Sequence, residues 1–275
     1  MPDPQPPPAP DPDAPADGAS GRDAGHGADR DGGRDARRHG GAGLTRRRGR
    51  LRRIARGLGL AAGAAGLAGL LWIAAYAVWL PPTTLLIETE RARLGAVDHR
   101  PVRLAELPPL VRLAFPAAED ARFCAHRGFD LIEIERARAD AAAGGRVRGA
   151  STISQQTAKN AYLWPARSWT RKAVEAGVTV AIETVWSKAR ILEVYLNVAE
   201  MGEGVFGLEA AAQTHFGKPA AALTAREAAL IAAALPSPRT RNPARPSDFL
   251  NRRARSIVSG AETLAAGGGA CVLGR

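Results

Sequence analysis

Four stretches between residues 116 and 207 carry acidic, basic, hydroxyl and amide side chains at spacings that could support chemistry. The first begins with Glu119 and Asp120, just after Pro116, where we expect a helix to start. On that helix Glu119 and Phe123 would share a face, because residues four apart are neighbours. A carboxylate beside an aromatic ring loses hydration, which raises its pKa and suits a general base. The structural alternative is that both acids complement the dipole of a first helical turn.

The second stretch surrounds one apolar residue, Ile153, with groups that donate and accept hydrogen bonds. Its polar members are Ser151, Thr152, Ser154, Gln155, Gln156, Thr157, Lys159 and Asn160. Recognition of a sugar requires this chemistry, since hydroxyl and amide groups must be matched by neutral donors and acceptors. The alternative is a serine or threonine N-cap followed by an ordinary surface helix.

The third stretch gathers Arg167, Arg171 and Lys172 shortly before Glu175, near a predicted helix start. Basic residues there oppose the helix dipole, so we expect them to bind an anion such as a diphosphate. The alternatives are a solvated cationic face and, for Glu175, a surface ion pair with its basic neighbours.

The fourth stretch is the apolar run 191–197, which leads into the glycine-rich loop 202–207. Glycines there would let a saccharide approach the backbone closely. The alternative is a helix C-cap followed by a turn.

A mainly helical domain, which we place at residues 81–260, must position these stretches. Apolar residues repeat at helical spacing in 173–186, and the capping-box pattern at 224–227 opens another helix. A short strand pair is predicted around 84–90 and 102–104.

Three segments of different composition precede this domain. Residues 1–45 contain too few large apolar residues to offset the entropy of ordering, so we expect a disordered tail, with a proline-rich docking segment as the alternative. Residues 46–56 are basic, and residues 57–80 contain no charged residue. As a helix, residues 57–80 would be about 36 Å long, enough to cross a hydrocarbon core of about 30 Å. This apolar span favours a membrane anchor over a nucleic-acid-binding role for the basic segment.

Arginines before the span and Pro81-Pro82 after it predict a cytoplasmic N-terminus and a periplasmic domain. A cleaved signal peptide is the alternative, but its apolar region is usually only about 7–15 residues long. The formal net charge of +11 also suits anionic lipid headgroups or a diphosphate substrate.

Two cysteines, Cys124 and Cys271, complete the inventory of reactive groups. An extracytoplasmic location permits a disulfide, but the sequence does not show that the two residues approach each other. We expect two free thiols, with Cys271 in a flexible glycine-rich tail, residues 261–275.

Taken in order, these segments resemble the peptidoglycan glycosyltransferases of glycosyltransferase family 51, and most closely their monofunctional biosynthetic branch. The sequence contains neither Ser-x-x-Lys nor Lys-Thr-Gly, so we expect no transpeptidase activity. The matching motifs are Glu119-Asp120-x-x-Phe123-x-x-His126-x-Gly128-Phe129-Asp130, Gly149-Ala150-Ser151-Thr152-Ile153-Ser154-Gln155-Gln156-x-x-Lys159-Asn160, Arg171-Lys172-x-x-Glu175, Ile191-Leu192-x-x-Tyr195-Leu196-Asn197 and Ala228-Ala229-Leu230-Ile231-Ala232.

The resemblance implies a mainly α, lysozyme-like glycosyltransferase domain behind a single N-terminal transmembrane helix in the bacterial inner membrane. It also implies that lipid II is the substrate and that the growing glycan chain is the donor. Glu119 would be the catalytic base for an inverting transfer that releases undecaprenyl diphosphate. The implied substrate-binding positions are Asp120, Phe123, His126, Ser151, Thr152, Gln155, Gln156, Lys159, Asn160, Arg167, Arg171, Lys172 and Asn197.

Glu175 matches the second catalytic carboxylate of the family, which acts near the diphosphate. We expect no obligatory cofactor. A Mg²⁺ or Mn²⁺ ion bridging Glu175 to the diphosphate and a structural clamp on the arginines are alternative roles for this residue. The expected partners are inner-membrane lipids and other cell-wall synthases, and no nucleic acid.

Two other functions compete with this prediction. A lytic, lysozyme-like hydrolase would also use one glutamate, but it would not need a cationic cluster for a diphosphate. A non-enzymatic membrane scaffold would use only the tail and the apolar span.

Overall fold

The computed structural model describes residues 41–145, 149, 151–166 and 168–273, which fall into two compact units divided after Leu60. Helix α1 (Gly41–Val78) begins in the first unit and continues into the second. Residues 1–40 of the predicted disordered tail lie outside the described residues. The prediction is wrong for residues 41–45, which belong to α1.

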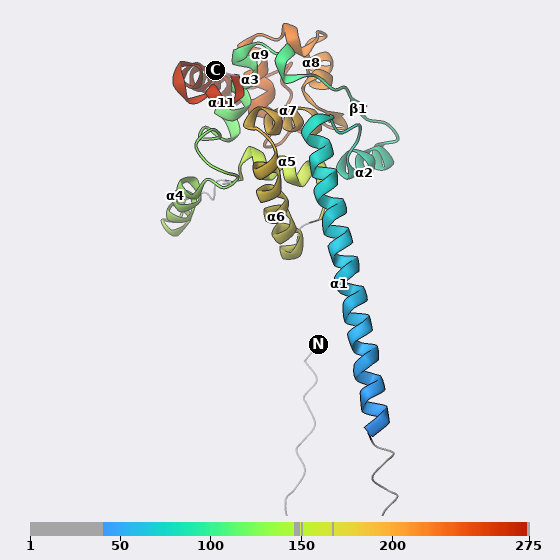
Figure 1. Ribbon diagram of the computed structural model, residues 1–275. Helices are drawn as coiled ribbons and strands as arrows, with labels where there is room; N and C mark the ends of the chain where they lie inside the picture. Colours follow the sequence, from blue (N-terminus) through green and yellow to red (C-terminus); the bar gives the residue numbers. More distant parts are fainter. Residues whose placement is uncertain (1–40, 146–148, 150, 167, 274–275) are drawn as a thin grey trace, which may run out of the picture. The chain divides into compact units, whose positions relative to one another are not determined.

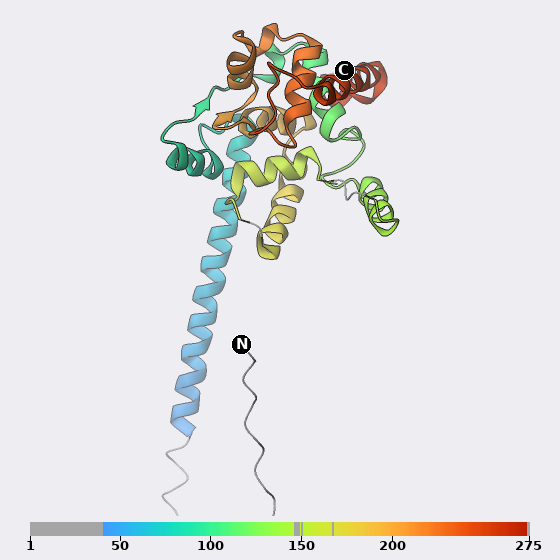
Figure 2. The same ribbon diagram turned by 180° about the vertical axis from the view of Figure 1, so that it is seen from behind.

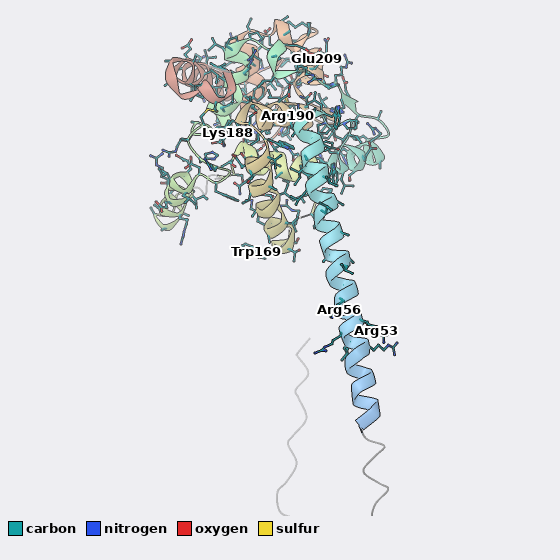
Figure 3. The ribbon with its side chains drawn as sticks, viewed as in Figure 1. Arg53, Arg56, Trp169, Lys188, Arg190 and Glu209 are labelled. Carbon is teal, nitrogen blue, oxygen red and sulfur yellow. A yellow bond between two sulfur atoms is a disulfide. The ribbon has the colours of Figure 1, made fainter. Side chains whose placement is uncertain are left out.

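Helix α1 contains a stretch, Arg50–Val78, that is 29 residues long and apolar enough to cross a membrane (Figure 1). Arg53 and Arg56 project from it near one end of this stretch (Figure 3). Large apolar side chains such as Leu67 are more than half exposed. Exposed apolar surface of this length is stable when lipid covers it, so this helix fits single-pass anchoring.

The end of α1 packs against the helical domain. The indole Nε1 of Trp186 donates a hydrogen bond to the carbonyl oxygen of Ile73 (2.9 Å), and Nε of Arg190 donates to that of Tyr76 (2.8 Å). The rings of Tyr76 and Tyr162 lie 5.6 Å apart. These contacts tie the last turns of the apolar span to the domain.

The second unit is mainly helical, as predicted. Its remaining α-helices are α2 (Leu85–Leu94), α3 (Pro109–Glu119), α4 (Leu131–Ala142), α5 (Ile153–Tyr162), α6 (Trp169–Val185), α7 (Lys188–Val198), α8 (Leu208–Phe216), α9 (Ala225–Ala234), α10 (Asp248–Thr263) and α11 (Ala270–Leu273). Helix α5 packs against α6 and α7, and α3, α9 and α10 pack against one another (Figure 2). The alanine-rich, buried α9 allows this close approach because its side chains are small.

A three-stranded sheet in the order β1-β3-β2 lies beside these helices. Strand β3 (Val205–Phe206) pairs parallel with β1 (Asp98–His99) and antiparallel with β2 (Glu200–Gly202). The glycine-rich loop therefore includes the turn between β2 and β3. The turn of the structural alternative is confirmed, but the C-cap of α7 is Ala199 and no glycine of this loop.

The predicted strand pair is wrong. Residues 85–94 form α2, because the side chain of Thr84 accepts a hydrogen bond from the Ile87 amide (3.3 Å) and caps the helix. Gly95, with φ 81°, ends it. Residues 104–106 form a 3₁₀ turn.

The C-terminal residues also differ from the prediction, because Cys124 and Cys271 form a disulfide with a Cα–Cα distance of 5.7 Å. After α10 the chain forms one π-helical turn, 264–268, and then α11, whose Val272 is buried. The predictions of two free thiols and of a flexible tail are therefore both wrong for the described residues. Packing of this apolar residue brings together two cysteines that lie 147 residues apart in the sequence.

Candidate functional site

Glu119 is the last residue of α3, so the predicted helix start at this position is wrong. Asp120 ends the helix with φ −162° and ψ 69°. Phe123 therefore does not share a helix face with Glu119; its ring is buried, with Nζ of Lys188 4.4 Å from its centroid. An acid at a helix C-terminus is disfavoured by the dipole. Helix stability therefore does not explain the carboxylate at position 119.

Asp120 connects the end of α3 to the start of α5. Its Oδ2 accepts a hydrogen bond from the amide of Ile153 (3.0 Å), and its Oδ1 lies 2.9 Å from Nε2 of His126. Both Asp120 and His126 are buried. These contacts fix the turn that follows Glu119, so Asp120 and His126 position the site.

The polar second stretch supplies both the helix cap and the site. Thr152 and Gln155 form a capping box, in which each side chain accepts a hydrogen bond from the backbone amide of the other (3.2 and 3.1 Å). The N-cap alternative is thus confirmed for these two residues. Gln156 and Lys159, further along α5, instead line a pocket, and Ser151 is exposed beside Glu119.

The carboxylate of Glu119 is half-buried and accepts a hydrogen bond from Nε2 of Gln156 (3.1 Å). Burial raises the pKa of Glu119 above its ordinary value. The hydrogen bond from Gln156 and the positive charges of Arg253 and Lys159 act in the opposite direction, whereas Asp120 adds to the increase. A carboxylate in such surroundings can accept a proton from a hydroxyl group.

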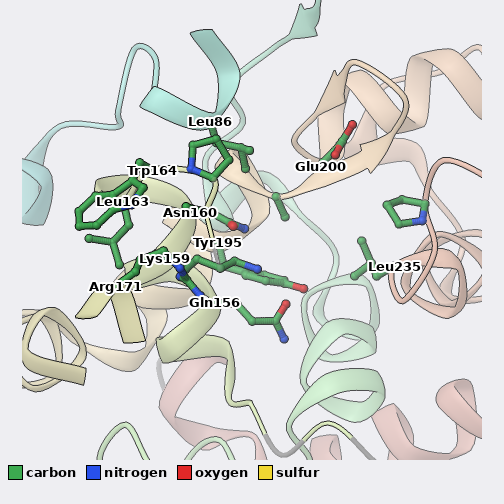
Figure 4. A pocket seen from close by; sticks show the side chains of 14 residues that line it. Leu86, Gln156, Lys159, Asn160, Leu163, Trp164, Arg171, Tyr195, Glu200 and Leu235 are labelled. Carbon is green, nitrogen blue, oxygen red and sulfur yellow. The ribbon is translucent and has the colours of Figure 1, made fainter. Parts of the chain in front are cut away.

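Gln156, the hydrogen-bond partner of Glu119, lines a pocket of about 500 Å³ (Figure 4). Its polar lining includes Gln156, Lys159, Asn160, Arg171 and Glu200, and its apolar lining includes Leu86, Leu163 and Trp164. Burial lowers the pKa of Lys159, while the carboxylate of Glu175 acts in the opposite direction. A pocket lined by both cationic and apolar side chains suits an anionic group attached to a lipid.

A second pocket, of about 370 Å³, is lined by Glu119 itself and is more polar. Its charged and hydroxyl-bearing lining residues are Glu119, Asp120, Arg122, Asp130, Glu133, Arg136, Asp140, Ser151 and Thr152. Glu119 lines this pocket, and Gln156, its hydrogen-bond partner, lines the first. The Glu119–Gln156 hydrogen bond therefore joins one lining residue of each pocket.

Glu175 is buried and paired with two cations from the preceding turn of α6. Nη1 of Arg171 lies 2.9 Å from Oε2, and Nζ of Lys172 contacts Oε1. The ion-pair alternative is therefore confirmed, although the carboxylate is buried and not on the surface. Because both oxygens are taken by cations, Glu175 does not fit the role of a metal ligand.

One group of possible metal ligands occurs in the described part of the chain, formed by Asp120, His126 and Asp130. Asp130 caps α4 and lies 3.1 Å from Nε of Arg122, and the other two residues bind each other. No cofactor is established by this arrangement.

Asn197 is only 1% exposed, which contradicts the predicted contact with substrate. Its side chain accepts a hydrogen bond from the Val102 amide (2.8 Å) and donates to the carbonyl oxygens of Val102 (2.9 Å) and Glu193 (2.7 Å). Asn197 therefore joins α7 to the chain that leads into α3.

Replacing Asn197 with alanine is expected to lower the free energy of unfolding by about 3 kcal/mol, since it leaves two buried backbone groups of Val102 without a partner. Chemical denaturation measures this change. Gln213→Ala, which removes one bond to Glu209 on α8, is the control and should have a much smaller effect. Equal losses in the two variants would refute the assigned role.

Arg167 lies outside the described residues. Three residues that the sequence did not single out contribute to the site: Leu86 and Trp164 line the first pocket, and Arg253 lies near Glu119. Their sequence neighbourhoods carry no distinctive pattern. Leu86 lies on α2 and Arg253 on α10, and only the packing of these helices brings the two residues to the site.

The sequence matches the family described as Transglycosylase over residues 88–262, more than half of the chain. A protein from Jannaschia sp. (strain CCS1) is 55% identical over 199 residues, covering 72% of this chain and 82% of the relative. Proteins from Rhodospirillum centenum and Pseudomonas aeruginosa are 53% and 46% identical, covering 70% and 68% of this chain and 87% of each relative. All three bear the name biosynthetic peptidoglycan transglycosylase.

Proposed function

Because the chain belongs to the transglycosylase family, we propose that it polymerises lipid II into the β-1,4-linked glycan strands of peptidoglycan. It is a glycosyltransferase of cell-wall synthesis. The observation that carries the proposal is the position of Glu119, a half-buried carboxylate that lines a polar pocket and accepts a hydrogen bond from Gln156, which lines a second pocket containing Lys159 and Arg171.

In this mechanism Glu119 accepts the proton of the 4-hydroxyl of the acceptor sugar. The oxygen attacks the anomeric carbon of the donor, the bond from that carbon to the diphosphate breaks, and the configuration inverts. An acceptor hydroxyl is a weak nucleophile while protonated, so a positioned base accelerates the attack. The raised pKa of Glu119 makes it a stronger base than an exposed carboxylate.

The leaving undecaprenyl diphosphate carries negative charge, which Lys159 and Arg171 in the first pocket can stabilise. Glu175 holds the guanidinium of Arg171 through a buried ion pair, so we assign it a supporting role, without direct contact to substrate. The apolar wall of the same pocket suits the beginning of the lipid chain. These assignments require no step through a metal ion.

In the described residues one N-terminal helix fits single-pass membrane anchoring, and we infer that the domain behind it faces the periplasm at the inner membrane. The arginines at the start of the span support a cytoplasmic N-terminus. At the start of α6, Trp169 is 90% exposed, and Val174 is also exposed. Apolar residues in such positions can enter the lipid surface, where the substrate resides.

Purified full-length protein given lipid II is expected to form glycan polymer, detected by gel electrophoresis of labelled substrate. The same protein given intact sacculi should release no soluble fragments, because the proposed reaction forms the glycosidic bond. Fragments from sacculi without polymer from lipid II would overturn the proposed function in favour of a lytic enzyme.

A further inference from the structure

Arg253 reaches the catalytic end of α3 from α10. Its Nη2 donates a hydrogen bond to the carbonyl oxygen of Ala118, the residue before Glu119 (3.3 Å). The two helices are in close contact here, since a Cβ added to Gly260 would lie 3.2 Å from the Cβ of Ala117. Nε of Arg253 is buried and has no hydrogen-bond partner among the described residues. Among the described residues, the hydrogen bond to Ala118 is therefore the polar contact that holds this guanidinium.

The carboxylate of Glu119 has charged or titratable neighbours on several packed elements. Asp120 follows it in the chain, Lys159 lies on α5, Tyr195 on α7, and Arg253 on α10. Gln156 supplies a neutral hydrogen bond. Among these neighbours, Arg253 and Lys159 are the cations that favour the charged carboxylate, and they oppose the effect of burial. The two cations differ in their contacts. Lys159 also lines the first pocket, whereas Arg253 does not line that pocket and donates its hydrogen bond to α3.

We propose that Arg253 is a positioning residue that holds the last turn of α3 against α10 and keeps Glu119 in its charged, proton-accepting form. The proposal rests on the proposed function of Glu119. It assigns Arg253 no contact with substrate. The positive charge of Arg253 acts through space on the Glu119 carboxylate. The hydrogen bond to Ala118 positions the backbone next to Glu119.

The test compares the pH dependence of lipid II polymerisation in the wild type, Arg253→Met and Arg253→Lys. Loss of the positive charge raises the pKa of Glu119. A smaller fraction of the enzyme then has a deprotonated Glu119 at low pH. The acid limb of kcat in Arg253→Met is expected to move to higher pH by up to roughly one unit, with activity partly recovered in alkaline buffer. Arg253→Lys keeps the charge and should retain most of the wild-type profile.

Arg255→Met is the matched control, because Arg255 lies exposed on the same helix and is expected to leave the profile unchanged. Thermal unfolding of each variant separates a general loss of stability from a change in the profile. An acid limb that stays in place in Arg253→Met, with activity reduced equally at every pH, would overturn the proposal.

A second measurement does not depend on turnover. Carbon-13 NMR titration of glutamate carboxyl groups, with Glu119→Gln used to assign the signal, should show a higher pKa for Glu119 in Arg253→Met than in the wild type. Identical titrations would also overturn the proposal. This measurement decides the role of Arg253 even if the wild type fails to polymerise lipid II, an outcome that would instead refute the proposed function.

Discussion

Replacing Glu119 with glutamine is expected to lower kcat for glycan polymerisation by about 10²–10⁴-fold. Glutamine has nearly the same shape as glutamate and can keep a hydrogen bond with Gln156, but it cannot accept the proton of the attacking hydroxyl. The effect should therefore appear in the chemical step, while binding of lipid II and the melting temperature change little. Polymer formation from labelled lipid II, under single-turnover conditions, measures the rate.

A matched control replaces Glu203, an exposed glutamate near β2 that pairs with Arg93 on the surface, with glutamine. This variant should polymerise at the wild-type rate. If Glu119→Gln also kept the wild-type rate, Glu119 would not be the base. Loss of polymerisation with membrane anchoring intact would exclude a purely structural scaffold.

Removing the disulfide in a Cys124→Ser/Cys271→Ser variant is expected to lower the free energy of unfolding by roughly 2–5 kcal/mol. The bond closes a loop of 147 residues, and cross-links over long loops restrict the unfolded chain most strongly. For a domain of this size, each kcal/mol corresponds to a fall of roughly 2–4 °C in the melting temperature. Thermal unfolding in detergent, with and without a dithiol reductant, measures the change.

The double variant also serves as the control for the reductant, which should destabilise only the wild type. Equal melting temperatures for oxidised wild type, reduced wild type and variant would show that the disulfide contributes nothing to stability. Because Cys124 lies in the turn that follows Glu119, we further expect activity to fall with stability as the temperature rises.

Several elements could be predicted because their physical causes are local. The apolar span of α1 follows from its length and lack of charge, and the capping box at Thr224 from hydrogen bonds within one turn. The pairing of Glu175 with Arg171 and Lys172 follows from helical spacing of three and four residues. The order of the motifs was sufficient to indicate the family, which the comparisons confirm.

Other predictions failed where distant residues decided the outcome. Residues 84–90 are predicted to form a strand, but the cap at Thr84 and packing of α2 near α5 favour a helix. Asn197 belongs to a motif of the family, yet its side chain bonds to Val102, 95 residues away. A polar residue in a motif can form hydrogen bonds either with a ligand or with the protein backbone, and only its burial distinguishes the two roles.

Glu119 illustrates both sides of this division. The sequence by itself determined that a carboxylate stands here before a hydroxyl- and amide-rich segment and a cationic cluster, and that an apolar helix precedes the domain. Only the tertiary structure decided that the residue ends α3, that it lines one pocket while its partner Gln156 lines another, and that Arg253 and Cys271 come close to the turn beside it. The physical reason is that burial and through-space charge, which set the pKa of a base, depend on residues far apart in the chain.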